Sequence, residues 1–153
     1  MKILVFSDSH RNVRPMVNAV VRESPNTIIH LGDHESDAEA LSREFPDIPI
    51  TSVPGNCDLA PFGKRFLSFT LAGKSFFITH GHPYGVKMGY NSLINTAAAA
   101  GADIALFGHT HIPYSTTVSG MLVCNPGSVG MDSRTYGVLT IGNGEIKYEK
   151  KDS

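Results

Sequence analysis

The sequence predicts an α/β protein with two packed mixed β-sheets, a β-sandwich, flanked by α-helices. Three observations support this fold class. Short apolar runs alternate with amphipathic helical segments over the first third of the chain. Later residues form short strand-like segments separated by glycine-containing turns. Polar side chains follow the strand-like segments, at the positions where open α/β sheets bind ligands.

The opening third has three strand-like segments with a helix-like segment in each interval. The strands are expected at residues 2–6, 27–30 and 50–53, and the helices at residues 12–23 and 36–44. A β-α-β-α-β order of this kind predicts a parallel sheet with right-handed crossovers.

Both of these helices have start signals in the sequence. Asn12 can cap the first helix, and Ser36 can cap the second, with Glu39 three residues later in a capping-box pattern. In the first helix, apolar side chains recur at helical spacing and are expected on one buried face: Val13, Met16, Val17, Val20 and Val21.

The remainder of the chain has a different pattern. A hairpin is expected around Ala72-Gly73, and a helix that begins near Val86 or Tyr90 should end at Gly101. Further turns are expected at Gly120 and at Asn143-Gly144. The strands are expected at residues 65–70, 75–79, 103–107, 116–119, 121–124, 136–141 and 145–149. This pattern predicts a mostly antiparallel sheet packed on the first one.

Length and composition limit the classes of protein to which this chain can belong. A chain of 153 residues fits one domain, residues 1–153. The net charge of −1 argues against a general nucleic-acid binder. Cys57 and Cys124 do not form a disulfide framework, and reduced thiols are typical of a cytoplasmic protein. The first apolar run is too short for a signal peptide, and no stretch reaches the roughly 20 apolar residues of a membrane helix.

Five short clusters of metal-ligating residue types each follow a strand-like segment. They are Asp8-Ser9-His10, Gly32-Asp33, Gly55-Asn56-Cys57-Asp58, His80-Gly81-His82 and Gly108-His109-Thr110-His111. Carboxylates, neutral imidazoles and an amide oxygen are hard or borderline ligands for divalent metals. Together the clusters predict a two-metal site built from loops.

Each cluster taken alone has a simpler interpretation. Asp33 could equally be a helix cap or turn residue, and Asn56 after a glycine favours a turn. His109 and His111 could be a strand-end pair without a metal. If the Asp8–His10 segment is extended, its alternation points both side chains the same way, so they can hold one ion.

The order of the motifs resembles the calcineurin-like metallophosphoesterases: D-x-H, G-D, G-N-x-D, H-G-H and G-H-T-H. The short length and the Gly55-Asn56-Cys57-Asp58 form are most similar to the small YfcE-like phosphodiesterase branch. The resemblance implies a four-layer metallophosphoesterase fold. It also implies hydrolysis of a small phosphate ester, preferably a phosphodiester, by a hydroxide that bridges two metals.

The resemblance also implies a ligand set for two divalent ions. Asp33 would bridge both ions. The first ion would be held by Asp8, His10 and His111, and the second by Asn56, His80 and His109. Manganese is the first candidate, with zinc, iron or nickel as alternatives. For His109 and His111 to serve different ions the backbone must be irregular, which Gly108 would permit.

One position departs from the larger relatives. Their histidine after Gly-Asn is replaced by Cys57, and a thiol with a pKa near 8.5 is a poor acid for the leaving group. Cys57 could be a weak acid, a substrate contact or merely a small residue beside Asn56. His82 could donate a proton, contact phosphate or hydrogen-bond a ligand. We assign Asp33, Asn56 and His82 to catalysis, and Asn56, Cys57 and His82 to substrate contact.

Other residues near the motifs have two interpretations each. Asp58 could orient a metal ligand or stabilise a turn. The segment Asn125-Pro126-Gly127-Ser128 could contact phosphate or form a structural turn. Three aromatic side chains could shape a substrate pocket or simply pack: Phe62, Phe66 and Tyr84.

Alternative functions remain open at this point. Phosphomonoesterase or cyclic-nucleotide phosphodiesterase activity is the nearest alternative to the phosphodiesterase. A protein-binding scaffold of the same fold is an alternative of another class, which the complete ligand set disfavours. Self-association into a homo-oligomer is open, and no membrane partner is expected.

Overall fold

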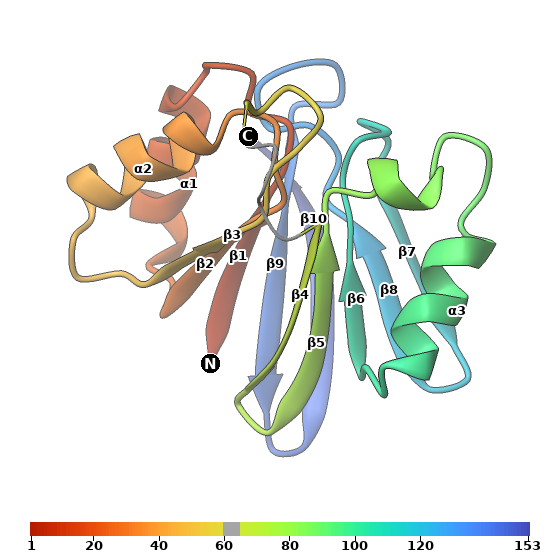
Figure 1. Ribbon diagram of the computed structural model, residues 1–153. Coiled ribbons are helices and arrows are strands. Elements are labelled where there is room, and N and C mark those ends of the chain that lie inside the picture. Colours follow the sequence, from red (N-terminus) through yellow and green to blue (C-terminus); the bar gives the residue numbers. More distant parts are fainter. Residues whose placement is uncertain (60–64) are drawn as a thin grey trace.

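Two five-stranded β-sheets face each other, and helices cover their outer faces (Figure 1). The computed structural model describes residues 1–59 and 65–153. From one side to the other, the four layers are the helices α1 and α2, the first sheet, the second sheet and the helix α3. The predicted fold class, two mixed sheets flanked by helices, is confirmed.

The first sheet has the strand order β10-β9-β1-β2-β3. Its strands β1 (Lys2–Phe6), β2 (Thr27–His30) and β3 (Ile50–Ser52) are parallel, as the β-α-β-α-β pattern predicts. The last two strands, β9 (Thr135–Gly142) and β10 (Glu145–Asp152), form a hairpin whose strand β9 pairs antiparallel with β1. The expectation that these strands belong to the second sheet is therefore wrong.

The second sheet has the strand order β4-β5-β6-β8-β7, and its three central strands are parallel. The expected mostly antiparallel sheet is wrong because α3 (Asn91–Ala99) crosses between β5 and β6, which makes them parallel neighbours. Only the outer pairs β4–β5 and β7–β8 are antiparallel. The strands are β4 (Phe66–Leu71), β5 (Lys74–Thr79), β6 (Ile104–Leu106), β7 (Tyr114–Val118) and β8 (Met121–Asn125).

The helices pack as expected, but their starts differ from the prediction. In α1 (Arg14–Glu23), Met16 and Val20 are buried, whereas Val21 is 68% exposed and does not belong to the buried face. The residue before α1 is Val13, and the Asn12 amide donates to the Gly130 carbonyl (3.4 Å) instead of capping the helix.

The second helix, α2 (Glu35–Glu44), begins one residue earlier than expected, and Ser36 does not cap it. The cap comes from another part of the chain, because the Glu35 backbone N–H donates to Asp58 Oδ1 at 2.8 Å. A local capping-box pattern cannot reveal a cap of this kind.

Three apolar clusters hold the layers together. The central cluster lies between the sheets, and the outer two lie under α1 and α2 and under α3. Each fully buried large apolar side chain stabilises the fold by roughly 1.5–3 kcal/mol. The central cluster includes Ile3, Val5, Ile29, Phe76, Ile78, Leu106 and Leu139.

The hairpin turns follow the glycine signals in the sequence. Ala72-Gly73, Ser119-Gly120 and Asn143-Gly144 each place two successive residues at positive φ. Two positive φ angles are typical of the two-residue type I′ turn that matches the twist of paired strands. The predicted turns are confirmed.

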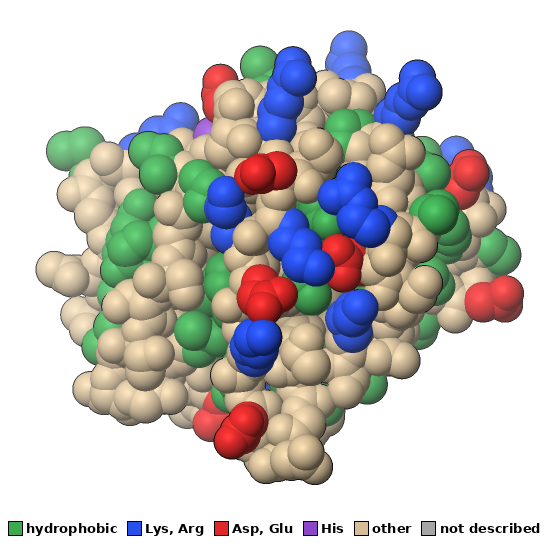
Figure 2. Space-filling view, turned by 180° about the vertical axis from the view of Figure 1, so that it is seen from behind, with side chains coloured by type: hydrophobic (Ala, Val, Ile, Leu, Met, Phe, Trp, Pro, Cys, Tyr) green, Lys and Arg blue, Asp and Glu red, His purple; other side chains and the backbone are tan. Residues whose placement is uncertain are grey.

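The face where β9 and β10 lie has a mixture of both charge signs (Figure 2). Lys147 pairs with Glu149 (2.8 Å), and Lys150 with Asp152 (3.0 Å). Lysines along an edge strand also discourage edge-to-edge association with other sheets. Throughout the described ranges, no helix has the length and apolar character needed to cross a membrane.

A buried carboxylate, Glu23, ties the end of α1 to both strands at the edge of the first sheet. It accepts hydrogen bonds from Lys151 Nζ (2.8 Å) and Tyr136 Oη (3.1 Å), and Lys2 Nζ lies 3.5 Å away. The Lys151 hydrogen bond, followed by weaker contributions, lowers the pKa of Glu23. A carboxyl group with a lowered pKa stabilises the fold above its unfolded-state pKa and loses this contribution as the pH falls.

We therefore expect Glu23→Gln to lower the free energy of unfolding by about 1–3 kcal/mol at pH 7. The deficit should be smaller at about pH 3, because the contribution of the charged carboxyl group is progressively lost as the pH falls below its unfolded-state pKa of 4.5. Urea denaturation at both pH values measures the difference. Glu44→Gln, at an exposed position of α2, is the matched control. An equal deficit at both pH values would contradict the assignment.

Candidate metal centre

The loops that carry the predicted ligands lie at one edge of the sandwich, beyond the carboxyl ends of the parallel strands (Figure 1). The loops concerned lie at the top of the view and come from both sheets. Asp8 and His10 follow β1, Asp33 follows β2, Asn56 follows β3, His80 follows β5, and His109 and His111 follow β6.

One group of donor atoms consists of Asp8, His10 and His111. The His111 Nε2 atom lies 3.2 Å from Asp8 Oδ1 and 3.2 Å from His10 Nε2. Asp8 is fully buried, and its Oδ2 accepts hydrogen bonds from Ser7 Oγ (2.6 Å) and the His109 N–H (3.0 Å). Its Oδ1 is buried with no well-aligned donor among the described residues.

The other group surrounds His80 Nε2. Asn56 Oδ1 lies 3.1 Å from this atom, His109 Nδ1 3.2 Å and Asp33 Oδ1 3.5 Å. The His80 Nδ1 atom donates to the Leu31 carbonyl at 2.7 Å. Because the carbonyl can only accept, Nδ1 holds the proton and Nε2 presents its lone pair to the group.

Asp33 lies between the two groups. Its Oδ1 is 3.5 Å from His80 Nε2, and its Oδ2 is 3.9 Å from His10 Nε2. The Cys57 N–H donates to Oδ1 at 3.0 Å and orients the carboxylate. One carboxylate therefore faces both sets of donors, which is the placement required of a bridging ligand.

The donor atoms fit divalent ions in chemistry and spacing. Ligand atoms that each lie about 2.1 Å from one ion, at angles near 90–110°, are about 3.0–3.4 Å apart. The contacts of 3.1–3.2 Å within each group match this spacing. Adjacent imidazole lone pairs and the unmatched Asp8 Oδ1 would be satisfied by a cation. Each group could therefore hold one divalent ion.

Five of the seven predicted ligands adopt left-handed backbone conformations. The φ angles of Asp8, His10, Asp33, His109 and His111 lie between 47° and 69°. Such conformations are uncommon for residues other than glycine, and they concentrate at functional sites. The expected extended geometry of Asp8 and His10 is therefore wrong, although both side chains still converge on His111.

Gly108 serves a different purpose from the one expected. The histidines themselves adopt the irregular conformation, with φ of 69° at His109 and 60° at His111. A Cβ atom on Gly108 would overlap Ser7 Oγ and lie 2.9 Å from Asp8 Oδ2. The glycine is needed because the loop passes directly against the buried Asp8 carboxylate.

Several residues that hold the ligand loops were not recognised in the sequence. Asp37 accepts from Ser9 Oγ (2.7 Å) and from the Arg11 N–H (2.8 Å), which fixes the loop containing Asp8 and His10. Asp132 is hydrogen-bonded to His111 Nδ1. Neither carboxylate lies in a recognisable motif, so no sequence signal points to it.

The Asn125–Ser128 segment is structural. Asn125 Nδ2 donates to the Gly108 carbonyl and to Thr110 Oγ1, both at 3.0 Å. Ser128 Oγ donates to the Asp8 carbonyl at 2.8 Å. Of its two interpretations, the structural turn is therefore the one that the contacts support.

Asp58 stabilises the turn that carries Asn56, and it bonds to no predicted ligand side chain among the described residues. Its Oδ2 accepts from the Gly55 N–H at 2.8 Å, and its Oδ1 accepts from Glu35. Phe66 and Tyr84 both pack on the buried Phe77, with ring centroids 5.1 and 5.9 Å away. Phe62 lies outside the described residues.

The two histidines of the Gly108–His111 loop have opposite pKa shifts. Burial, followed by the neighbouring His80, lowers the pKa of His109 to about 4, so His109 is neutral and able to bind a metal. The Asp8 carboxylate, whose Oδ1 lies 3.2 Å from His111 Nε2, and the hydrogen bond to Asp132 raise the pKa of His111 to about 9 against the effect of burial. An ion that binds His111 must therefore displace a proton.

Two residues predicted to contact substrate border the donors. The His82 ring lies 5.5 Å from that of His80 and 6.0 Å from that of His109, and burial lowers its pKa. Cys57 is exposed, and its Sγ lies within 4.8 Å of ligand atoms of His10 and Asp33. Partial burial, followed by the charge of Asp33, raises the thiol pKa, so Cys57 holds its proton at neutral pH.

The chain belongs to the calcineurin-like phosphoesterase superfamily, whose domain model matches residues 1–144. A probable metallophosphoesterase of Bacillus subtilis, YsnB, is 33% identical over 149 residues, covering 94% of this chain and 86% of that protein. The phosphodiesterase YfcE of Escherichia coli K12 is 29% identical over 167 residues, covering 91% and 87%.

Proteins that are less similar in sequence share the same fold. The structure of Vps29 from Entamoeba histolytica complexed with zinc superposes with a TM-score of 0.76 at 19% identity. The match covers 99% of each chain. At this identity the likeness concerns the fold alone.

Proposed function

We propose that this protein is a divalent-metal-dependent phosphoesterase that hydrolyses phosphodiesters at a binuclear site. The observation that carries the proposal is the meeting of two ligand groups at Asp33, whose oxygens face His80 and His10 at 3.5 and 3.9 Å. A structural metal site needs only one closed group. Two adjacent groups on an open edge suit the in-line displacement of a phosphate ester.

The ligand types set the order of candidate metals. Mixed carboxylate, amide and imidazole ligands suit manganese, zinc, iron or nickel, and manganese is our first candidate. Two such ions, when bound, would lower the pKa of water to about 7, which yields hydroxide as the nucleophile, and would stabilise charge on the phosphoryl oxygens. Asp8 and Asp33 cancel only part of the metal charge, so the site would attract an anion.

The side chains beside the metal ligands are poor proton donors for the leaving group. His82 is largely neutral at pH 7 because its pKa is lowered, and its Nδ1 is buried with no hydrogen-bond partner in the described part of the chain. The Cys57 thiol keeps its proton. These residues can contact the ester oxygens but protonate them weakly. Weak protonation favours phosphodiesters with acidic leaving groups.

A protein-binding scaffold is the second candidate function. Vps29, with which this chain shares the fold, has been solved in complex with zinc. Metal binding alone therefore cannot separate the two candidates. Metal-dependent turnover separates them, because a scaffold needs no nucleophile.

The test is an assay of metal-stripped protein with manganese, zinc, iron or nickel added back. Bis(p-nitrophenyl) phosphate, p-nitrophenyl phosphate and a cyclic nucleotide are the substrates, and circular dichroism verifies the fold. We expect manganese to restore diester cleavage. Dominant cleavage of the monoester or the cyclic nucleotide would overturn the diester preference. Folded protein without turnover under any of these ions would refute the enzyme and leave the scaffold.

A further inference from the structure

We propose, on the basis of the proposed function, that Arg65, Lys87 and His82 form an anion subsite beside His80 and His109. This subsite would bind a second phosphate group of the substrate. The preferred substrate class would then be a phosphodiester that bears another phosphate near the one that is cleaved.

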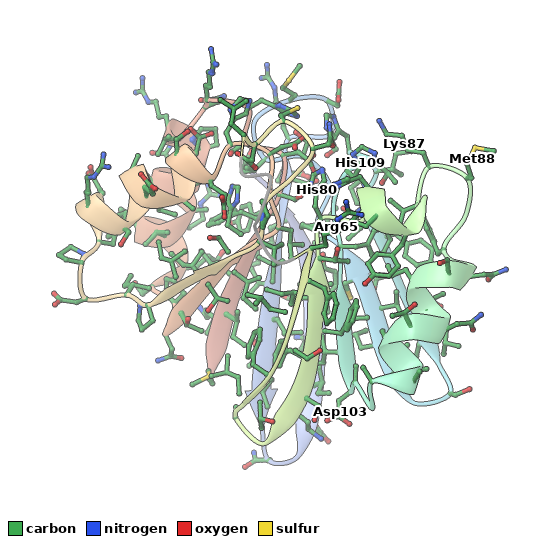
Figure 3. The ribbon with its side chains drawn as sticks, viewed as in Figure 1. Arg65, His80, Lys87, Met88, Asp103 and His109 are labelled. Atoms are coloured by element: carbon green, nitrogen blue, oxygen red, sulfur yellow. The ribbon has the colours of Figure 1, made fainter. Side chains whose placement is uncertain are left out.

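Arg65 is held next to His80 by the second sheet. Strands β4 and β5 are antiparallel with Phe66 opposite Thr79, so Arg65 and His80 are the next residues beyond the paired ends of the two strands. Thr79 Oγ1 donates to the Arg65 carbonyl at 2.7 Å and fixes the backbone there. Figure 3 shows Arg65 and His80 at the same end of β5.

Lys87 is held on the other side of the same loops. Its neighbour Val86 is buried against Gly81, where an added Cβ would lie 2.9 Å from Val86 Cγ2 and 3.5 Å from the Gly108 carbonyl. This packing joins the loop of Lys87 to the loops of His80 and His109. Figure 3 labels Lys87 and His109 at the same end of the molecule.

The two cations have no counter-charge within residues 1–59 and 65–153. Neither forms an ion pair there, and both are exposed, so their charges are available to an anion beside the predicted ligands.

Unpaired cations beside a metal pair favour an anion with more charge than a simple diester. Arginine can bind phosphate through two parallel hydrogen bonds, and lysine acts as a point charge. His82, on the loop between β5 and Lys87, offers the buried Nδ1 that lacks a partner among the described residues.

A cavity beside Arg65 provides room for the rest of such a substrate. Its volume is about 430 Å³, and Arg65, Phe66, Leu67 and Ser68 line it. Phe66 is 44% exposed there, so an apolar surface adjoins the cation. Cavities of roughly 300–1,000 Å³ with an apolar wall and few polar groups are typical of small-molecule sites.

The test compares two chromogenic diesters with manganese-loaded protein: the p-nitrophenyl ester of thymidine 5′-phosphate, with and without a 3′-phosphate. We expect kcat/KM to be about tenfold higher for the 3′-phosphorylated ester, mainly through KM. The double variant Arg65→Ala, Lys87→Ala should reduce the ratio of the two values to about one. The matched control, Arg43→Ala with Lys74→Ala, alters an exposed α2 residue and the far end of β5 and should keep the ratio.

Calorimetric titration with inorganic pyrophosphate and phosphate provides a readout that does not depend on turnover. Wild-type protein should bind pyrophosphate more tightly than phosphate, and the double variant should not. Equal kcat/KM for both esters in the wild type would overturn the subsite while leaving the phosphodiesterase intact. If neither ester is cleaved, the proposed function fails, and the pyrophosphate titration alone decides on the subsite.

Discussion

Replacement of Asp33 by asparagine should abolish metal-dependent turnover while leaving the fold intact. The side chains have nearly the same shape, so the hydrogen bond from the Cys57 N–H can persist. The change removes one negative charge and one of the two oxygens that face His80 and His10. Even changes outside the direct ligands typically reduce metal affinity or activity 10–100-fold, so we expect a loss of at least about 100-fold in kcat.

The loss should be accompanied by a change in metal content. Mass spectrometry of the dialysed protein should find less manganese per chain in Asp33→Asn than in the wild type. Asp47→Asn, at an exposed position beyond α2, is the matched control and should retain both values. Unchanged metal content together with unchanged kcat in Asp33→Asn would show that this carboxylate does not bridge the two groups.

Alanine at position 108 should damage both the fold and the metal centre. The added methyl group would overlap Ser7 Oγ and press on Asp8 Oδ2, which already accepts two hydrogen bonds. Overpacking of a tight interior usually costs about 1–3 kcal/mol, and we expect a loss of this size in the free energy of unfolding. Urea denaturation measures the stability, and mass spectrometry measures the retained metal.

Gly142→Ala is the matched control for this substitution. Gly142 ends β9, its φ is not positive, and an added Cβ would meet no atom of the described residues within 4 Å. The control should therefore retain wild-type stability and metal content. A Gly108→Ala protein that equals the control in both measurements would contradict the close approach of this loop to Asp8.

Local sequence patterns predicted the helices and strands well, but they predicted which strands pair with one another less well. The apolar run 2–6 is strand β1 because its side chains are buried on both faces, as in a parallel sheet. Nothing in that run tells which strand will pair on its other side, and β9 does so from the far end of the sequence. The parallel pairing of β5 and β6 could have been predicted from the sequence, because a helix was expected between them.

The candidate site likewise has features that the sequence predicted and features that it did not. The ligand types and their order along the chain were recognisable, and the structure brings all seven residues together. The left-handed conformations were not recognisable, because the propensities of Asp and His favour other regions and only the surrounding contacts hold them there. Asp37 and Asn125 act through bonds to the backbone of distant loops, which sequence spacing does not reveal.

The pairing of β1 with β9 bears on how the protein forms during synthesis. Chains emerge from the ribosome with the N-terminus first, at about 5–20 residues per second. All ligands from Asp8 to His111 precede Thr135, where β9 begins, so the entire set emerges while β1 still has one unpaired edge. Contacts between residues so far apart in sequence form slowly. The nascent chain thus presents an apolar strand edge until the hairpin of β9 and β10 has been synthesised.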